Sequence, residues 1–308
     1  MNFLKYTFIT VLSIVLICCK TNSSSEKTVD SISAKFNYLP KAPVSGTLKG
    51  VVELGNTGYN YFIIEIDTLS NWKLKHLEYG KSLIAEGMTT AEEIEGKLDS
   101  FIKEIESIGV SKEHISFVVS SGAIKEEGTN LFVEELRKKD HETKVVTPKE
   151  EGIYALKSVL PKKFAKESFI VDLGSGNTKV SYIKDNDTIV LETHGSKYHQ
   201  RGTEDEQVFD DVKKIVASIP KENTKYCFFI GGVPAQLASG LRKNNERYTL
   251  LFTDGKKFDK IAAEKGKKVQ SGLNIYKALV EGTDCNTLIF DWESNFTIGY
   301  LVDKTTKS

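Results

Sequence analysis

The hydrophobic positions in the first part of the chain form short apolar runs, followed by residues at helical spacing. Runs at 46–56, 60–66 and 71–78 are separated by short turns, which predicts three consecutive β-strands in a meander. Thr90 and Glu93 then form a capping-box pattern, and the apolar residues after them predict an α-helix. The apolar residues of this helix are Ile94, Leu98, Phe101, Ile102 and Ile105.

Strand and helix patterns continue to alternate after this helix. They predict a strand at 115–119, a helix at 131–138, a strand at 143–146 and a helix that begins near Pro148. Proline is tolerated at a helix start, and the two glutamates that follow it suit the positive end of the helix dipole.

The second half of the chain repeats this order. Strands are predicted at 168–174, 178–184 and 187–192, then a helix, then a strand at 225–230 that ends at a pair of glycines. The helix is marked by Phe209, Val212, Ile215 and Val216. Meander, helix, strand and helix, twice over, predict a duplicated α/β fold with a mixed sheet in each half.

Two glycine-containing turns of the same design, at 51–58 and 170–178, stand at corresponding places in the two halves. Each follows an apolar run that ends in a carboxylate, Glu53 or Asp172, and each reads as a β-hairpin. Successive backbone N–H groups in such turns can form a concave anion site, and small residues allow phosphate oxygens to approach. The pair therefore suggests a phosphate-binding cleft between the halves, with carboxylates able to hold Mg²⁺ or a water.

Several motifs together resemble one protein family. Glu53-Leu54-Gly55-Asn56-Thr57 is similar to its first phosphate loop, Asp-Ile-Gly-Ser-Asn, and the segment 172–178 resembles its second, Asp-Ile-Gly-Gly-Gly-Ser-Thr. Ser120-Ser121-Gly122-Ala123, the segment 145–152 and Gly231-Gly232-Val233-Pro234 match further family segments in register. The chain thus resembles, from about residue 46 to its end, the exopolyphosphatase and guanosine-pentaphosphate phosphohydrolase (Ppx/GppA) family of the actin, Hsp70 and sugar-kinase ATPase superfamily.

The resemblance implies two ribonuclease-H-like, actin-like lobes, at 46–167 and 168–308, with a phosphate-binding cleft between them. It implies Glu53 and Asp172 as ligands of Mg²⁺ or another divalent cation, and Glu150 as the general base that activates water. The alternative interpretation is that Glu150 and its neighbour Glu151 only stabilise the positive end of the helix dipole at the helix start. The implied phosphate-binding residues are Gly55, Asn56, Thr57, Ser120, Ser121, Gly174, Ser175, Gly176, Asn177, Thr178, Gly231 and Gly232.

Three residues depart from the family pattern. Glu53 stands where the family has Asp, Ile124 where it has Arg, and Lys179 where it has Glu.

The resemblance and these departures leave three functions open. The first is a metal-dependent phosphatase that releases terminal phosphate from polyphosphate or a nucleotide polyphosphate. The second is a catalytically degenerate phosphate-binding protein on the same fold. The third is an actin-like ATPase, because the segment 176–180 also resembles plasmid-segregation actins, although export would argue against it.

The N-terminal segment predicts a bacterial cell-envelope protein. Lys5 precedes an apolar run at 6–17 that ends at Cys18 and Cys19, the layout of a secretory signal that resembles a lipobox. We expect a signal peptide at 1–19, lipidation at Cys19, or less favourably at Cys18, and a flexible tether at 20–45, in which residues 20–35 are rich in Ser, Thr, Asn and Lys. An uncleaved anchor and an ordinary signal are the alternatives to this extracytoplasmic, membrane-anchored lipoprotein.

Composition and residue spacing limit the classes of ligand and partner that are expected. The chain has 42 basic and 42 acidic residues, so no general attraction to a nucleic acid duplex is indicated. The five His residues show no metal-ligand spacing. Cys227 lies in an apolar run, where a buried thiol is favoured over a disulfide. The expected partners are polyphosphate or a nucleotide polyphosphate and a lipid membrane, and a homodimer stays open.

Overall fold

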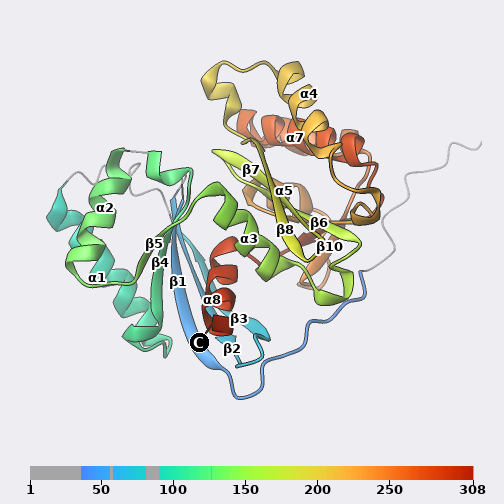
Figure 1. Cartoon of the computed structure of the whole chain (residues 1–308). Helices are drawn as coiled ribbons and strands as arrows, with labels where there is room; N and C mark the ends of the chain where they lie inside the picture. The colour runs from blue at the N-terminus through green and yellow to red at the C-terminus, as the bar shows by residue number, and fades with distance from the viewer. Residues whose placement is uncertain (1–35, 56–57, 81–89, 126, 308) are drawn as a thin grey trace, which may run out of the picture. The chain divides into compact units, whose positions relative to one another are not determined.

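Five strands form the first of two mixed β-sheets, in the order β3-β2-β1-β4-β5 (Figure 1). The structure is a computed structural model that describes residues 36–55, 58–80, 90–125 and 127–307. The meander is antiparallel, whereas β4 joins β1 and β5 joins β4 in parallel. The strands are β1 (Thr47–Gly55), β2 (Gly58–Ile66), β3 (Trp72–Tyr79), β4 (Ile115–Val119) and β5 (Thr143–Val145).

The second sheet has six strands in the order β10-β11-β9-β6-β7-β8. Its meander is again antiparallel and its first strand again pairs in parallel with the strand that follows a helix, here β9. The strands are β6 (Ser168–Leu173), β7 (Asn177–Lys184), β8 (Asp187–His194), β9 (Tyr226–Ile230), β10 (Tyr248–Leu251) and β11 (Leu288–Asp291). The shared topology of the two sheets confirms the duplicated, two-lobed α/β fold.

Helices cover the sheets on both sides. One face of the first sheet is covered by α1 and α2, and one face of the second by α4 and α7. Between the sheets, α3 and α8 pack against each other (Figure 1). The helices are α1 (Ala91–Ser107), α2 (Glu127–Lys138), α3 (Pro148–Val159), α4 (Asp205–Val216), α5 (Gly232–Ala238), α6 (Asp259–Lys265), α7 (Lys267–Thr283) and α8 (Phe296–Lys307).

Strand alternation explains the layers. In β1, Val51 faces the core formed with α3 and α8, while its neighbour Val52 faces α1, as expected from a side-chain period of two. The central helices cross between the halves, since α3 contacts β6, β7 and β8 and α8 contacts β1 and β2. Gly299 of α8 lies against the backbone of Tyr154 in α3, where a Cβ atom would lie 1.8 Å from the Tyr154 carbonyl oxygen.

Most predicted elements are confirmed, including the capping box of α1, in which Glu93 N donates to Thr90 Oγ1. Helix α2 begins four residues before the predicted 131–138, because its first turn carries no apolar residue that would reveal it. No counterpart was predicted for β10, α6 and α7, which lie between α5 and β11. Cys227 and Cys285 are buried free thiols, as expected for Cys227.

The segment 36–45 is not the loose tether that the sequence predicted. The ring of Phe36 packs against Phe164 and Tyr248 at centroid distances of 5.2 and 5.6 Å, and Val44 N donates to Asp67 Oδ2 at 3.1 Å. Aromatic burial offsets the entropy of ordering this stretch. The predicted signal at 1–19, Cys19 and the remainder of the tether lie outside the described residues.

Candidate functional site

One cavity of about 470 Å³ brings the two glycine turns together. It is lined by Gly55 and Gly58 at the ends of the first turn and by the second turn at 174–177. The predicted residues that line it are Glu53, Gly55, Ser120, Asp172, Gly174, Ser175, Gly176, Asn177, Gly231 and Gly232. Asn56 and Thr57 lie outside the described residues. Ser121 and Thr178 do not line the cavity. Ser121 N and Oγ donate to Glu151, and Thr178 Oγ1 donates to the carbonyl oxygen of His194.

The second turn is held by a segment that sequence reasoning missed. Ser196 N donates to the Gly174 carbonyl oxygen at 3.0 Å, and Lys197 N donates to that of Ser175 at 2.9 Å. At Gly195 a Cβ atom would lie 2.4 Å from Asn177 N, so only glycine allows this approach. Gly231 has a φ of +108°, and a Cβ there would lie 2.5 Å from the Leu173 carbonyl oxygen. The turn is therefore fixed before any ligand binds.

Glu151 is the acidic residue that α3 places in the cavity. Its side chain is fully buried, with Oε1 accepting from Ser121 N at 2.7 Å and Oε2 from Ser121 Oγ at 3.0 Å. Lys179 Nζ also contacts Glu151 Oε2, and Lys179 is only 5% exposed. The carboxylate thus joins the end of β4 to β7 across the two lobes.

Glu150, the predicted general base, does not line this cavity, and the structure supports the alternative reading of this residue. Its Oε2 accepts from Thr147 N at 2.8 Å in a capping box at the start of α3, and its Oε1 accepts from Lys144 Nζ at 2.6 Å. These bonds and Lys144 hold the pKa of Glu150 below its usual range, although partial burial opposes them. Helical geometry is the reason, since adjacent residues point about 100° apart around the axis.

Two further carboxyl groups of the cavity have pKa values that are raised toward neutral pH. Burial raises the pKa of Glu53 to about 7, and the nearby Asp172 adds to the shift. Burial also raises the pKa of Asp172 to about 6, with Glu151 adding to the shift and Lys179 opposing it. Asn60 and Asn295 each donate to Glu53 Oε2 at 3.0 Å. Asn295 was not predicted, and it also accepts at Oδ1 from Thr297 N at the start of α8.

The residues do not fit a metal ion held jointly by Glu53 and Asp172. Asp172 is the direct cross-strand partner of Lys179, whose ammonium lowers the Asp172 pKa and would repel a second cation. In the part of the chain that the structure describes, no group of three or more His, Cys, Asp or Glu residues is arranged to hold a metal. Carboxylate oxygens are ligands that Mg²⁺ prefers, so the obstacle is the neighbouring ammonium and not the chemistry of the donors.

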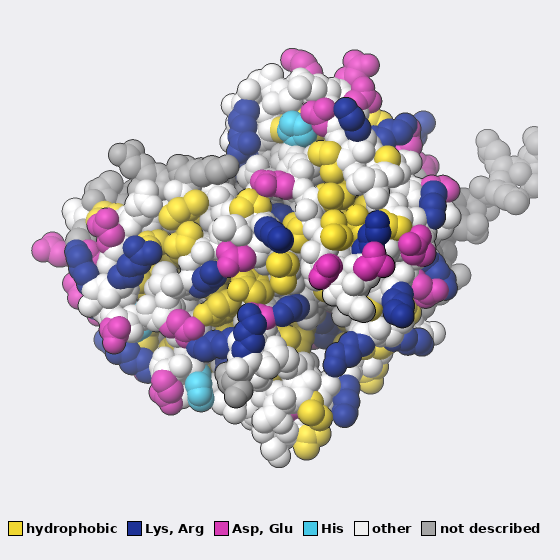
Figure 2. Space-filling model, in the orientation of Figure 1, with side chains coloured by type: hydrophobic (Ala, Val, Ile, Leu, Met, Phe, Trp, Pro, Cys, Tyr) yellow, Lys and Arg dark blue, Asp and Glu magenta, His cyan; other side chains and the backbone are white. Residues whose placement is uncertain are grey.

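Basic side chains also line the cavity. Arg242 and Lys268 are half-buried there, and burial lowers the Lys268 pKa with help from nearby Lys197. The Arg242 guanidinium lies 4.4 Å from the ring centroid of Trp292. No sequence motif singled these residues out. On the face that Figure 2 displays, basic and acidic side chains are interspersed.

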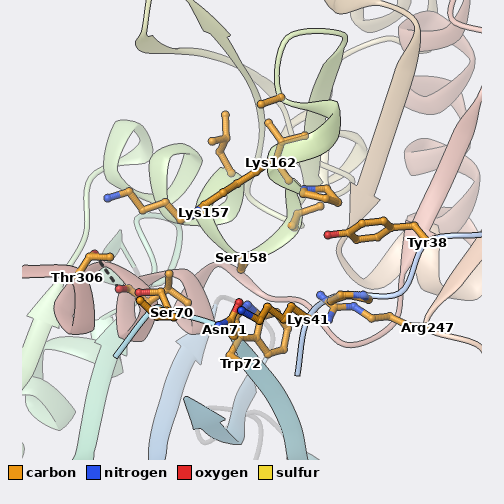
Figure 3. Close-up of a pocket in the computed structure, with 18 of the residues that line it drawn as sticks. Tyr38, Lys41, Ser70, Asn71, Trp72, Lys157, Ser158, Lys162, Arg247 and Thr306 are labelled. Carbon is orange, nitrogen blue, oxygen red and sulfur yellow. Dashed lines mark hydrogen bonds between the residues drawn. The ribbon is translucent and has the colours of Figure 1, made fainter. Parts of the chain in front are cut away.

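A larger cavity of about 750 Å³ contains neither glycine turn. Figure 3 shows Lys157, Lys162 and Arg247 around it. Lys157 is paired with Asp303, and Arg247 donates to both carboxylate oxygens of Asp291 at 3.0 Å. Two of its cations are therefore already paired with carboxylates, and none of the predicted phosphate-binding residues among those described lines this larger cavity.

Comparison with known proteins supports the same fold. No protein-family model matches the sequence, and no curated protein matches it. The Aquifex aeolicus member of the Ppx/GppA family has a TM-score of 0.65 and 17% identity, with 85% of this chain and 98% of that chain covered. An exopolyphosphatase from Cytophaga hutchinsonii has a TM-score of 0.59 and 14% identity, with the same coverage. The resemblance seen in the motifs is therefore confirmed at the level of structure: this chain has the fold of the Ppx/GppA exopolyphosphatase structures.

Proposed function

We propose that this protein is a phosphatase that releases the terminal phosphate of polyphosphate or of a nucleotide polyphosphate. The observation that carries the proposal is the single cavity shared by the glycine turn at 174–177 and the carboxylates Glu53, Glu151 and Asp172. Phosphoryl transfer to water depends mostly on positioning and on charge stabilisation, which such a cavity can supply. The similar structures described as exopolyphosphatases support the same substrate class.

Glu53 is the carboxylate best placed to accept a proton from water. Its pKa of about 7 matches neutral solution, where a general base is most effective. Asn60 and Asn295 fix Oε2, and Oε1 has no hydrogen-bond partner among the described residues. In this scheme water attacks the terminal phosphorus, Glu53 takes the water proton, and the phosphoanhydride bond breaks to release the shortened chain.

Glu151 has a different part in the scheme. Both of its oxygens are engaged, by Ser121 and by Lys179, so it holds these groups in place. This same observation favours the second candidate, a protein that binds phosphate-rich ligands without hydrolysing them, because the acidic residue of α3 is not free to act on water.

Phosphate release distinguishes the phosphatase, the binding protein and an actin-like ATPase. The full chain is incubated with tripolyphosphate, ATP and guanosine pentaphosphate, each with Mg²⁺ and with EDTA. We expect release of inorganic phosphate from tripolyphosphate, from guanosine pentaphosphate or from both. Binding of tripolyphosphate with no release under any condition would contradict the phosphatase and favour the binding protein, and release from ATP alone would favour an actin-like ATPase.

We further propose that the chain is exported and anchored through lipid at Cys19. The support is the sequence of Lys5, the apolar run and the two cysteines. Among the residues that the structure describes, none of the helices combines the length and apolar character needed to cross a membrane. Mass spectrometry of the protein from its membrane fraction should find a lipidated N-terminal Cys19, and an intact Met1 would contradict processing.

A further inference from the structure

Lys179 is a buried basic side chain of the 470 Å³ cavity that contains the second glycine turn. It lies in β7 and lines the cavity, and a Cβ built on Gly174 would be 3.9 Å from its Nζ. The ammonium is therefore beside the second glycine turn. A lysine ammonium has three donors, and Glu151 Oε2 is one acceptor for them.

Ser196 supplies an unsatisfied donor in the same cavity. It is fully buried, it lines the cavity, and its backbone N–H holds the Gly174 carbonyl oxygen. Its Oγ has no hydrogen-bond partner within the described residues. A buried hydroxyl without a partner costs about 1–3 kcal/mol, which a ligand oxygen would offset.

The carboxylates that line the cavity make a buried cation necessary if a phosphate chain is to bind there. Glu53, Glu151, Asp172 and Asp291 all line it, and together they would repel a phosphate chain. Arg247 already neutralises Asp291. Lys179 is more deeply buried than the half-buried Arg242 and Lys268, so it acts where the dielectric is lowest.

We propose that Lys179 is the resident cation of this site, and that Lys179 and Ser196 bind the terminal phosphate directly, without a divalent metal. The proposal rests on the proposed function for the identity of the ligand, a linear phosphoanhydride. It assigns a reason to the charge reversal at this position, where the family resemblance has Glu. The side chain provides the charge that a metal would otherwise bring.

Calorimetric titration of the full chain with tripolyphosphate tests this, in EDTA and again in Mg²⁺. Wild-type protein should bind in EDTA, and Lys179→Gln should lower that affinity by about 30-fold or more, the usual effect of removing one partner of a buried charged contact. Ser196→Ala should weaken binding by about fivefold, the worth of one hydrogen bond. Lys144→Gln is the matched control, since Lys144 pairs with Glu150 as Lys179 pairs with Glu151, but outside the cavity. It should leave the affinity unchanged.

A double variant separates loss of phosphate binding from misfolding. Lys179→Gln leaves Glu151 buried without its partner, so Lys179→Gln combined with Glu151→Gln restores neutrality and should also lack binding in EDTA. Glu151→Gln alone should tighten binding about tenfold, because it removes a carboxylate beside the phosphate. Wild-type binding that requires Mg²⁺, or a folded Lys179→Gln that binds normally in EDTA, would overturn the proposal. Binding in EDTA without any phosphate release would support it while the phosphatase fails, so the two are tested separately.

Discussion

Glu53→Gln should lower the rate of phosphate release by about 10² to 10⁴-fold, the usual worth of a general base. Glutamine keeps the shape of the side chain and an oxygen for Asn60 and Asn295, but it cannot accept a proton. Tripolyphosphate affinity should not fall, because the substitution removes a negative charge from the cavity and removes no group that binds phosphate. Because the pKa of Glu53 is raised to about 7, kcat/KM of the wild type should rise as pH increases through about 7 and then level off. The residual activity of the variant should lack this rise.

Two further substitutions control this result. Glu150→Gln should leave turnover within about twofold, because Glu150 caps α3 outside the cavity. Glu53→Asp should also reduce turnover, since the shorter side chain cannot reach Asn60 and Asn295 as Glu53 does. Loss of activity in Glu150→Gln with normal activity in Glu53→Gln would reject the assignment of the base.

Gly299→Ala should destabilise the fold by about 3 kcal/mol or more. The added Cβ would lie 1.8 Å from the carbonyl oxygen of Tyr154, and backbone atoms cannot move aside as a flexible side chain can. Helices α3 and α8 would separate, and both sheets pack on this pair. Thermal unfolding should show a fall of about 6 °C or more, at about 2–4 °C per kcal/mol in a domain of this size.

Gly96→Ala is the matched control for this prediction. Gly96 lies within α1, and nothing lies within 4 Å of a Cβ built there. Alanine favours a helix over glycine by about 1 kcal/mol, so this variant should unfold at a higher temperature than the wild type. An unchanged stability in Gly299→Ala would show that the close contact of α3 with α8 does not hold the lobes.

The fold could be predicted because its signals are local. Short apolar runs mark β1, β2, β6 and β7, the capping box at Thr90 marks where α1 begins, and Pro148 marks the start of α3. The stretch from α5 to β11 lacks comparable signals, and its elements become clear only from their packing. The order in 36–45 also depends on distant aromatic partners, which no local pattern reveals.

The site was harder to predict because its contacts connect distant parts of the chain. Glu53 and Asp172 could be found from their turns, but Asn295, which holds Glu53, lies 242 residues away. Motif register placed the base at Glu150, whereas helical geometry turns Glu151 into the cavity. Lys179 was visible only as a departure from the family pattern, and its contact with Glu151 required the structure.

The location of the bound anion tests the central claim most directly. A crystal structure of Glu53→Gln with tripolyphosphate should show the terminal phosphate against the turn at 174–177, with its oxygens about 3 Å from Lys179 Nζ and Ser196 Oγ. An anion held instead beside Lys157 and Lys162 in the larger cavity would contradict the account. So would an anion bound through a metal ion that Glu151 and Asp172 coordinate in place of Lys179.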